Sequence, residues 1–319
     1  MPLMINIHIT ILLLLGLTGI SQAREDLTYP EGPLTAEQVV RQVYIGARGG
    51  LVSNAVSQRN KGAVALVINR APLEKRVPGR MPTISTFETY VNNRPTDSAI
   101  KSKQMAILTS GKTKGTGVLL TNYIDQERGA TISMWLPALR KIRRINEPSH
   151  EDVWFGTTLT YGELVLRKTE DEIHELLGEG VFEHCLGVME LETWEKNRYT
   201  KKLPGQQCGH KGKPIYRLKS TTKFKNWWYD YHISDIDKES FSLYRSVYFK
   251  AGEKIKTVDV DWQSLDQPDP RISYPRYIYA LMHDSGKDSM VYVPRSTIQL
   301  NVDLPDSFWS EETMKRRTR

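Results

Sequence analysis

Apolar and polar residues alternate with a period of two through much of the second half of the chain, and this pattern restricts the fold more than any other. The clearest run sets Ile298, Leu300, Val302 and Leu304 against Thr297, Gln299, Asn301 and Asp303. Residues 241–250 alternate in the same way. Successive side chains of a strand point to opposite faces, so each run predicts a strand with one apolar side. Short turns at Ala251–Glu253 and Asp284–Gly286 then predict antiparallel hairpins.

The first half adds further strands and a helix. Apolar runs predict strands near residues 63–69, 84–91, 101–108, 117–123 and 131–136. The capping box Thr35–Gln38 predicts a helix that ends at Gly49–Gly50, and a second box at Thr169–Glu172 predicts a short helix carrying Ile173, Leu176 and Leu177. About ten strands with two or three helices indicate a mainly β (α+β) fold. We therefore expect a strongly curved antiparallel sheet, or unclosed β-barrel, covered by a few short helices.

The N-terminus is typical of an export signal. Residues 7–17 are apolar, and Ser21–Ala23 offers small residues for cleavage, although no Lys or Arg precedes the apolar run. The run is too short to span a bilayer comfortably. We expect residues 1–23 to be a cleaved signal peptide, residues 24–319 to form a single domain, and the protein to be periplasmic.

The chain carries a net charge of +7, all of it in the mature part. A positive charge favours anionic surfaces such as phospholipid headgroups, but it is also common on an ordinary solvated surface. Neither the basic tail Lys315–Arg319 nor any other stretch indicates nucleic acid as a partner.

There are two cysteines, Cys185 and Cys208. In an oxidising compartment they would form one disulfide that closes a loop, worth about 3 kcal/mol in the chain-entropy model. His184 and His210 lie beside them, so a tetrahedral zinc site is the alternative. The spacing is not a common finger spacing, and we favour the disulfide.

Residues 134–164 contain the most distinctive local pattern. An apolar strand ends in Trp135 and Leu136, turns through Pro137, and enters a run with four basic residues in five, Arg140, Lys141, Arg143 and Arg144. An aromatic pair, Trp154–Phe155, then precedes Gly156 and the segment Tyr161–Leu164.

This pattern resembles the signature of the LolA/LolB-like outer membrane lipoprotein-sorting proteins. In that family a strand ending in Trp-Leu-Tyr-Leu-Pro-Ala-Leu leads into a basic run and then an aromatic-Gly segment. The ending Asn301–Ser310 also looks like the family's closing strand and tail. The chain departs from the family in its longer Cys185–Cys208 loop, and in Gly156–Leu159, where Ser-Asp is common after the glycine.

The resemblance implies a LolA-like open barrel that binds acyl chains without covalent chemistry or a cofactor. It suggests that the signature's apolar residues line a cargo cavity or its lid: Trp135, Leu136, Leu139, Ile142, Trp154 and Phe155. The basic residues Arg140, Lys141, Arg143 and Arg144 are either a solvated turn or a contact for lipid phosphate or an acidic partner, since guanidinium pairs bidentately with phosphate.

Other motifs favour ordinary structural roles. Residues 106–113 fit a relaxed phosphate-loop pattern, but a strand follows where a helix is required, so we expect a hairpin turn. We expect Trp227–Tyr229 within a strand over residues 226–233, with one Trp facing the interior and the other facing outward. The histidines are scattered, and we find no nucleophile elbow and no zinc-protease pair.

The sequence therefore predicts a non-enzymatic periplasmic carrier for a lipid, lipoprotein or other amphiphile. The resemblance implies handover between an inner-membrane transporter, often of the RND/MMPL type, and an outer-membrane acceptor. The alternative is a non-catalytic envelope interaction protein that docks through its curved sheet, and an enzyme ranks third.

Overall fold

The computed structural model describes residues 27–47, 49–58, 65–125, 128–146, 148–165 and 168–318, so the predicted signal peptide lies outside the described residues. The fold is mainly β. Within these ranges there are three α-helices: α1 (Ala36–Ala47), α2 (Tyr161–Val165) and α3 (Glu311–Arg317). The strands of the first half are β1 (Asn54–Ser57), β2 (Ala65–Arg70), β3 (Thr83–Asn92), β4 (Ile100–Leu108), β5 (Gly117–Tyr123), β6 (Thr131–Leu136) and β7 (Lys141–Ile145). Those of the second half are β8 (Glu172–Val181), β9 (Pro214–Thr222), β10 (Tyr231–Asp237), β11 (Leu243–Lys250), β12 (Glu253–Ser264), β13 (Ser273–Met282), β14 (Asp288–Tyr292) and β15 (Ile298–Leu300).

All these strands belong to one antiparallel sheet that is not closed. Its order is β7-β6-β5-β4-β3-β2-β14-β13-β12-β11-β10-β9-β8, and β1 pairs with β3 and β15 beside this path. Each half is a meander, and the two halves meet where β2 pairs with β14, with Val67 opposite Val291. In the described part of the chain β7 and β8 do not pair with each other, so each ends the sheet as an edge strand. The predicted unclosed antiparallel sheet is confirmed.

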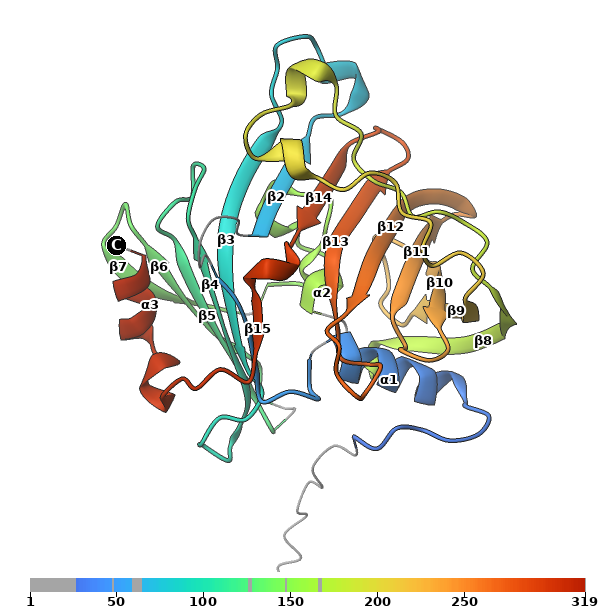
Figure 1. Ribbon diagram of the computed structural model, residues 1–319, viewed down its shortest axis with the longest axis horizontal. Helices are drawn as coiled ribbons and strands as arrows, with labels where there is room; N and C mark the ends of the chain where they lie inside the picture. Colours follow the sequence, from blue (N-terminus) through green and yellow to red (C-terminus); the bar gives the residue numbers. More distant parts are fainter. Residues whose placement is uncertain are drawn as a thin grey trace, which may run out of the picture.

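The sheet has two apolar faces. Val67, Val260 and Val291 belong to one core cluster, whereas their strand neighbours Ile68 and Met290 belong to another, as the period of two requires. We call the first face the inner face and the second the outer face. The inner face is covered by α1 and by α2, which lies between the two halves of the sheet in Figure 1.

The outer face is covered by two segments that are distant in sequence. The loop between β8 and β9 places Phe182, Leu186 and Met189 on the outer-face cluster of β2, β13 and β14. The C-terminal segment places Trp309 and Met314 on β3 to β6. Met314 leaves no room for a side chain on Gly117, where a Cβ would lie 2.5 Å from its Cγ.

Cys185 and Cys208 form a disulfide at the base of the outer loop. The predicted disulfide is therefore confirmed. Both sulfurs are consumed in it, which excludes them as thiolate ligands for zinc.

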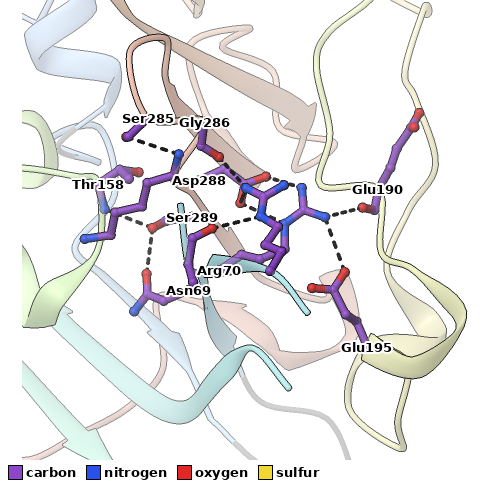
Figure 2. A network of polar contacts seen from close by, with 12 residues as sticks. Asn69, Arg70, Thr158, Glu190, Glu195, Ser285, Gly286, Asp288 and Ser289 are labelled. Atoms are coloured by element: carbon purple, nitrogen blue, oxygen red, sulfur yellow. Dashed lines mark hydrogen bonds and ion pairs between the residues drawn. The ribbon is translucent and has the colours of Figure 1, made fainter. Parts of the chain in front are cut away.

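A charged network fastens this loop beside the turn that follows β2 (Figure 2). Arg70 donates to both carboxylate oxygens of Asp288, at 2.9 and 2.5 Å, and to the Glu190 carbonyl and Glu195. Arg76 adds a second ion pair to Asp288 at 3.1 Å. Asp288 is fully buried, so its charge requires these partners.

Three predicted elements were wrong. The alternating run over residues 297–304 forms a strand only over Ile298–Leu300, as β15, because Asn301 takes a positive φ of 52° and ends the extended backbone. Val302 and Leu304 then pack on the outer-face cluster.

The expected helix after Thr169 is a single 3-10 turn followed by β8, which pairs with β9 along its length. A register shift between Leu176 and Gly178 leaves Leu177 as an extra, exposed residue. This bulge produces adjacent apolar residues that resemble helical spacing.

The expected strand over residues 226–233 begins only at Tyr231, as β10. Trp227 and Trp228 lie in the preceding loop, and both pack on the inner-face cluster instead of facing opposite ways. The alternation rule fails because these residues do not form strand pairs. By contrast, residues 109–116 form the predicted hairpin turn between β4 and β5.

Removing the disulfide by the double substitution Cys185→Ser/Cys208→Ser is expected to lower the free energy of unfolding by about 3 kcal/mol, because it frees a loop of 23-residue separation in the unfolded chain. Urea denaturation monitored by circular dichroism measures this loss. An unchanged midpoint would contradict the prediction, and reduction of the wild-type protein should reproduce the shift.

Arg70→Met is expected to cost about 3 kcal/mol of stability, because it leaves the buried Asp288 with one cation instead of two. The control is Lys238→Met, which breaks the solvent-exposed pair with Glu179 and should change stability little. Equal losses in the two variants would show that burial of the network is not what stabilises this region.

Candidate ligand cavity on the inner face

An apolar cavity of about 210 Å³ opens on the inner face. It lies between the C-terminal end of α1, the strands β1, β3 and β15, and the start of β13. Gly46, Gly49 and Asn93 contribute to one side. Its apolar lining comprises Ala47, Leu51, Val52, Ala55, Val56, Val91, Trp262, Leu265, Ile272, Pro275, Val293, Ile298 and Leu300. The walls offer dispersion contacts to a short apolar group and few hydrogen-bond partners.

Among the described residues of the cavity lining, Arg271 is the one that carries a charge, and it is 1% exposed. Its guanidinium donates to Gln42 of α1 at 2.7 Å, to the Leu27 and Thr28 carbonyls, and to Asp269. A hydrogen bond from Arg271 holds the pKa of Asp269 below its usual value. All its nitrogens are engaged, so Arg271 fastens α1 and the N-terminal segment to the β12–β13 turn and is not available to a ligand headgroup.

Much of the remaining inner face is occupied by the chain itself. The segment 153–165 lies on it, with Leu159 fully buried among residues of β2, β12 and β14. The amide of Thr158 donates to Ser289 Oγ at 2.9 Å, and the Thr158 hydroxyl donates to the Ala280 carbonyl at 3.1 Å. Ser289 in turn donates to Asn69 at 2.6 Å. Polar bonds at the centre of an apolar face thus fix the position of this segment.

A buried ion pair adds to this attachment. Thr160 and Glu163 form a capping box at the start of α2: the Thr160 amide donates to Glu163 Oε2, and the Glu163 amide donates to Thr160 Oγ1. The same Oε2 accepts from Lys256 Nζ of β12 at 2.5 Å. Lys256 is 1% exposed and its ammonium lies 4.9 Å from the centre of the Trp228 ring. This buried pair can separate without leaving an uncompensated buried charge only if both partners reach water together.

Farther along the inner face lies a hydrogen-bonded row of polar residues. Glu172 accepts from Tyr229 at 2.7 Å and lies 3.1 Å from His232 Nε2, while His232 Nδ1 lies 3.0 Å from Ser234. The connectivity is that of a carboxylate-histidine-serine triad. However, Ser234 is 1% exposed, is bonded to Ser246 at 2.8 Å, and does not line the cavity. We interpret the row as a structural network.

The structure does not gather the predicted cavity residues into one site. Trp135 and Ile142 are paired across β6 and β7 and pack on the outer face beneath α3. Trp154 lies on the inner face, with its ring 6.2 Å from that of Phe87. Leu136 is half-buried and Leu139 is exposed in the β6–β7 turn. The Phe155 side chain lies outside the described residues.

The basic run lies at the edge of the sheet. Arg140 ends the β6–β7 turn with a positive φ of 50°, and Lys141, Arg143 and Arg144 are exposed on β7. Arg144 pairs with Glu311 of α3 at 3.5 Å. None of these four residues lines the cavity, and their role as a headgroup or partner contact stays a prediction.

Sequence reasoning missed Arg271, Lys256 and Glu163. The pattern Thr160-x-x-Glu163 was a readable capping box. Lys256 occupies the inward position of an alternating strand, two residues before Val258, and this was a second signal. Nothing local in the sequence identifies the role of Arg271, because its partners Gln42 and Leu27 lie more than 220 residues away.

Among the described residues no cluster of His, Cys, Asp or Glu could hold a metal ion, and no helix is long and apolar enough to cross a membrane.

Comparison with known proteins identifies structures with a similar fold. A family described as an uncharacterized protein matches residues 101–204. No curated protein matches the chain. An outer membrane lipoprotein-sorting protein domain from Vibrio parahaemolyticus superposes with a TM-score of 0.60 at 14% identity, covering 88% of this chain and 98% of that one.

Two further structures are similar. A DUF1329 family protein from Desulfovibrio piger gives a TM-score of 0.58 at 15% identity, covering 86% of this chain and 98% of the other. A LolA superfamily protein from Nitrosomonas europaea gives 0.52 at 12% identity, covering 88% and 100%. The resemblance inferred from the sequence is thus confirmed at the level of the fold: the chain has the open, LolA-like sheet of outer membrane lipoprotein-sorting domains.

Proposed function

We propose that this protein is a periplasmic carrier, which binds a lipid, a lipidated protein or another amphiphile on the inner face of its sheet. It receives the cargo from an inner-membrane transporter of the RND/MMPL type and delivers it to the outer membrane. The observation that carries the proposal is the apolar cavity on the inner face of an unclosed sheet. Burial of an acyl chain there would gain about 0.8 kcal/mol per methylene without any covalent step.

The cavity alone is too small for a long chain, because ligand pockets usually enclose about 300–1,000 Å³. The rest of the inner face is covered by segment 153–165, which includes Trp154. In the proposed mechanism this segment leaves the face when cargo enters, and the apolar surface beneath Leu159 becomes the cargo site. Its attachment by a few polar bonds, instead of by a long helix, suits such an exchange.

The first test is lipid extraction and mass spectrometry of the mature protein purified from a bacterial periplasm under native conditions. A stoichiometric amphiphile supports the carrier function and identifies the cargo class. An empty protein that also fails to bind a fluorescent fatty-acyl probe would favour the alternative, an envelope interaction protein.

Ala55→Phe is expected to reduce affinity for the acyl probe by roughly tenfold or more, because the larger ring fills the cavity beside Val91. Ala99→Phe is the matched control, since it makes the same change at an exposed position before β4 that does not line the cavity. Probe titration measures both affinities, and thermal unfolding verifies that both variants fold. If Ala55→Phe bound the acyl probe with undiminished affinity, the cavity would not be part of the cargo site.

The exchange of segment 153–165 is tested by a cross-link. The Thr158 amide and Ser289 Oγ are 2.9 Å apart, so the double variant Thr158→Cys/Ser289→Cys is used to form a disulfide between the segment and β14. The oxidised variant should hold the segment in place and abolish uptake of long-chain probes. Each single variant, which cannot form the cross-link, should retain uptake. Full uptake by the cross-linked protein would contradict the exchange.

A further inference from the structure

One end of the sheet gathers basic side chains from three segments that are distant in sequence. The register pairs Ile107 with Gly117 and Gly117 with Trp135, so the β4–β5 turn and the β6–β7 turn lie at the same end. The end of α3 reaches both turns: a Cβ on Gly115 would lie 3.4 Å from the Thr318 carbonyl oxygen and 3.6 Å from Pro137. Figure 1 shows α3 beside β6 and β7 at the C-terminus.

We call this surface the basic end. It comprises two lysines of the β4–β5 turn, four residues of the β6–β7 hairpin and two of α3: Lys112, Lys114, Arg140, Lys141, Arg143, Arg144, Lys315 and Arg316. Two acidic residues lie on α3 nearby, Glu311 and Glu312, and Glu311 is already bonded to Ser133 and Arg144. Within the described residues, Arg144 is the only member of the basic end that has an ion-pair partner. The surface thus keeps a large uncompensated positive charge.

The basic end also has an apolar tip. Leu139 lies in the β6–β7 turn between Pro137 and Arg140 and is 52% exposed. Lys141 and Arg143 are paired with Leu136 and Met134, so their side chains point to the inner face. Arg144 is paired with Ser133, so its side chain points to the outer face. Cations therefore surround the exposed leucine on both sides of the edge strand. This arrangement suits a bilayer interface, where an apolar side chain enters the acyl boundary and cations remain at the phosphates.

We propose that the basic end docks the protein onto an anionic phospholipid bilayer, with Leu139 inserted and the surrounding Lys and Arg side chains at the headgroups. The inference deepens the proposed carrier function by assigning the surface that meets the membrane during cargo transfer. The cavity and the basic end are separate parts of the fold, so cargo binding and docking are measured independently. Surface cations near an anionic membrane act together, so a cluster of this size gives appreciable binding.

The test is sedimentation of the folded, cargo-free mature protein with vesicles of phosphatidylglycerol and phosphatidylethanolamine, compared with pure phosphatidylcholine. The expected result is binding only to the anionic vesicles and its loss as salt is raised, because ions screen the attraction. Arg143→Glu/Arg144→Glu should weaken binding at least about tenfold. Leu139→Ser should weaken it several-fold while preserving the salt dependence.

The matched control is Lys211→Glu/Lys213→Glu, an equal charge reversal at exposed positions before β9 in the other half of the sheet, and it should bind as the wild type does. Equal binding by the two charge-reversal variants, or equal binding to phosphatidylcholine, would overturn the proposal. The proposal would also be overturned if the wild-type protein bound none of the vesicles but bound an acidic peptide. That result would assign the basic end to a protein partner. In none of these cases does binding of the acyl probe change, so failure of docking is distinguishable from failure of the carrier function.

Discussion

The pairing of β2 with β14 is the contact on which the rest of the structure depends. It joins the two meanders into one sheet through strands that are more than 200 residues apart in sequence. Two adjacent residue pairs between these strands make contacts on opposite faces of the sheet: Arg70 is paired with Asp288 on the outer face, and Asn69 with Ser289 on the inner face. The outer pair holds the disulfide loop, and the inner pair holds segment 153–165 through Thr158. Both coverings of the sheet are therefore fixed at one place.

An unclosed sheet must bury its apolar faces with something other than a second sheet, and here the two faces are buried differently. The outer face is covered by a cross-linked loop and by the tightly packed Trp309 and Met314. The inner face is covered by short elements held by polar contacts, and it retains a cavity at one end. Apolar surface covered by a short, polar-anchored segment can be exchanged for apolar cargo at low net cost, because the area removed from water is nearly the same before and after. This asymmetry underlies the proposed carrier function.

The edges of the sheet serve a separate purpose. An exposed edge strand tends to pair with other chains, and charged residues on it oppose such pairing. The basic residues of β7 satisfy this requirement, and together with the turn lysines and α3 they also create the surface that we propose meets the membrane. The opposite edge, β8, is interrupted by its bulge at Leu177, which is a different solution to the same problem.

The amino-acid sequence alone was enough to predict the strand content, the open antiparallel class, the first helix and the disulfide. These depend on short-range patterns: alternation, capping residues, turn residues and a single possible cysteine pair. It also predicted the boundaries of β5 and β6 as observed. The prediction of a helix after Thr169 was wrong because the bulge in β8 gives apolar residues a helix-like spacing. The prediction of a strand at Trp227 and Trp228 was wrong because these aromatic residues lie in a loop.

The face of the sheet that each residue of the signature segment occupies could not be predicted from the sequence. It depends on tertiary structure: on the register of β6 against β5 and on the packing of α3. Trp135 and Trp154 belong to one motif yet lie on opposite sides of the sheet. The contacts of Arg271 with the N-terminal segment, of Lys256 with Glu163, and of α3 with the β4–β5 turn likewise join residues that are 93 to 244 positions apart in sequence. A local pattern specifies the orientation of a side chain relative to its own strand, whereas its neighbours are fixed only when distant strands pair.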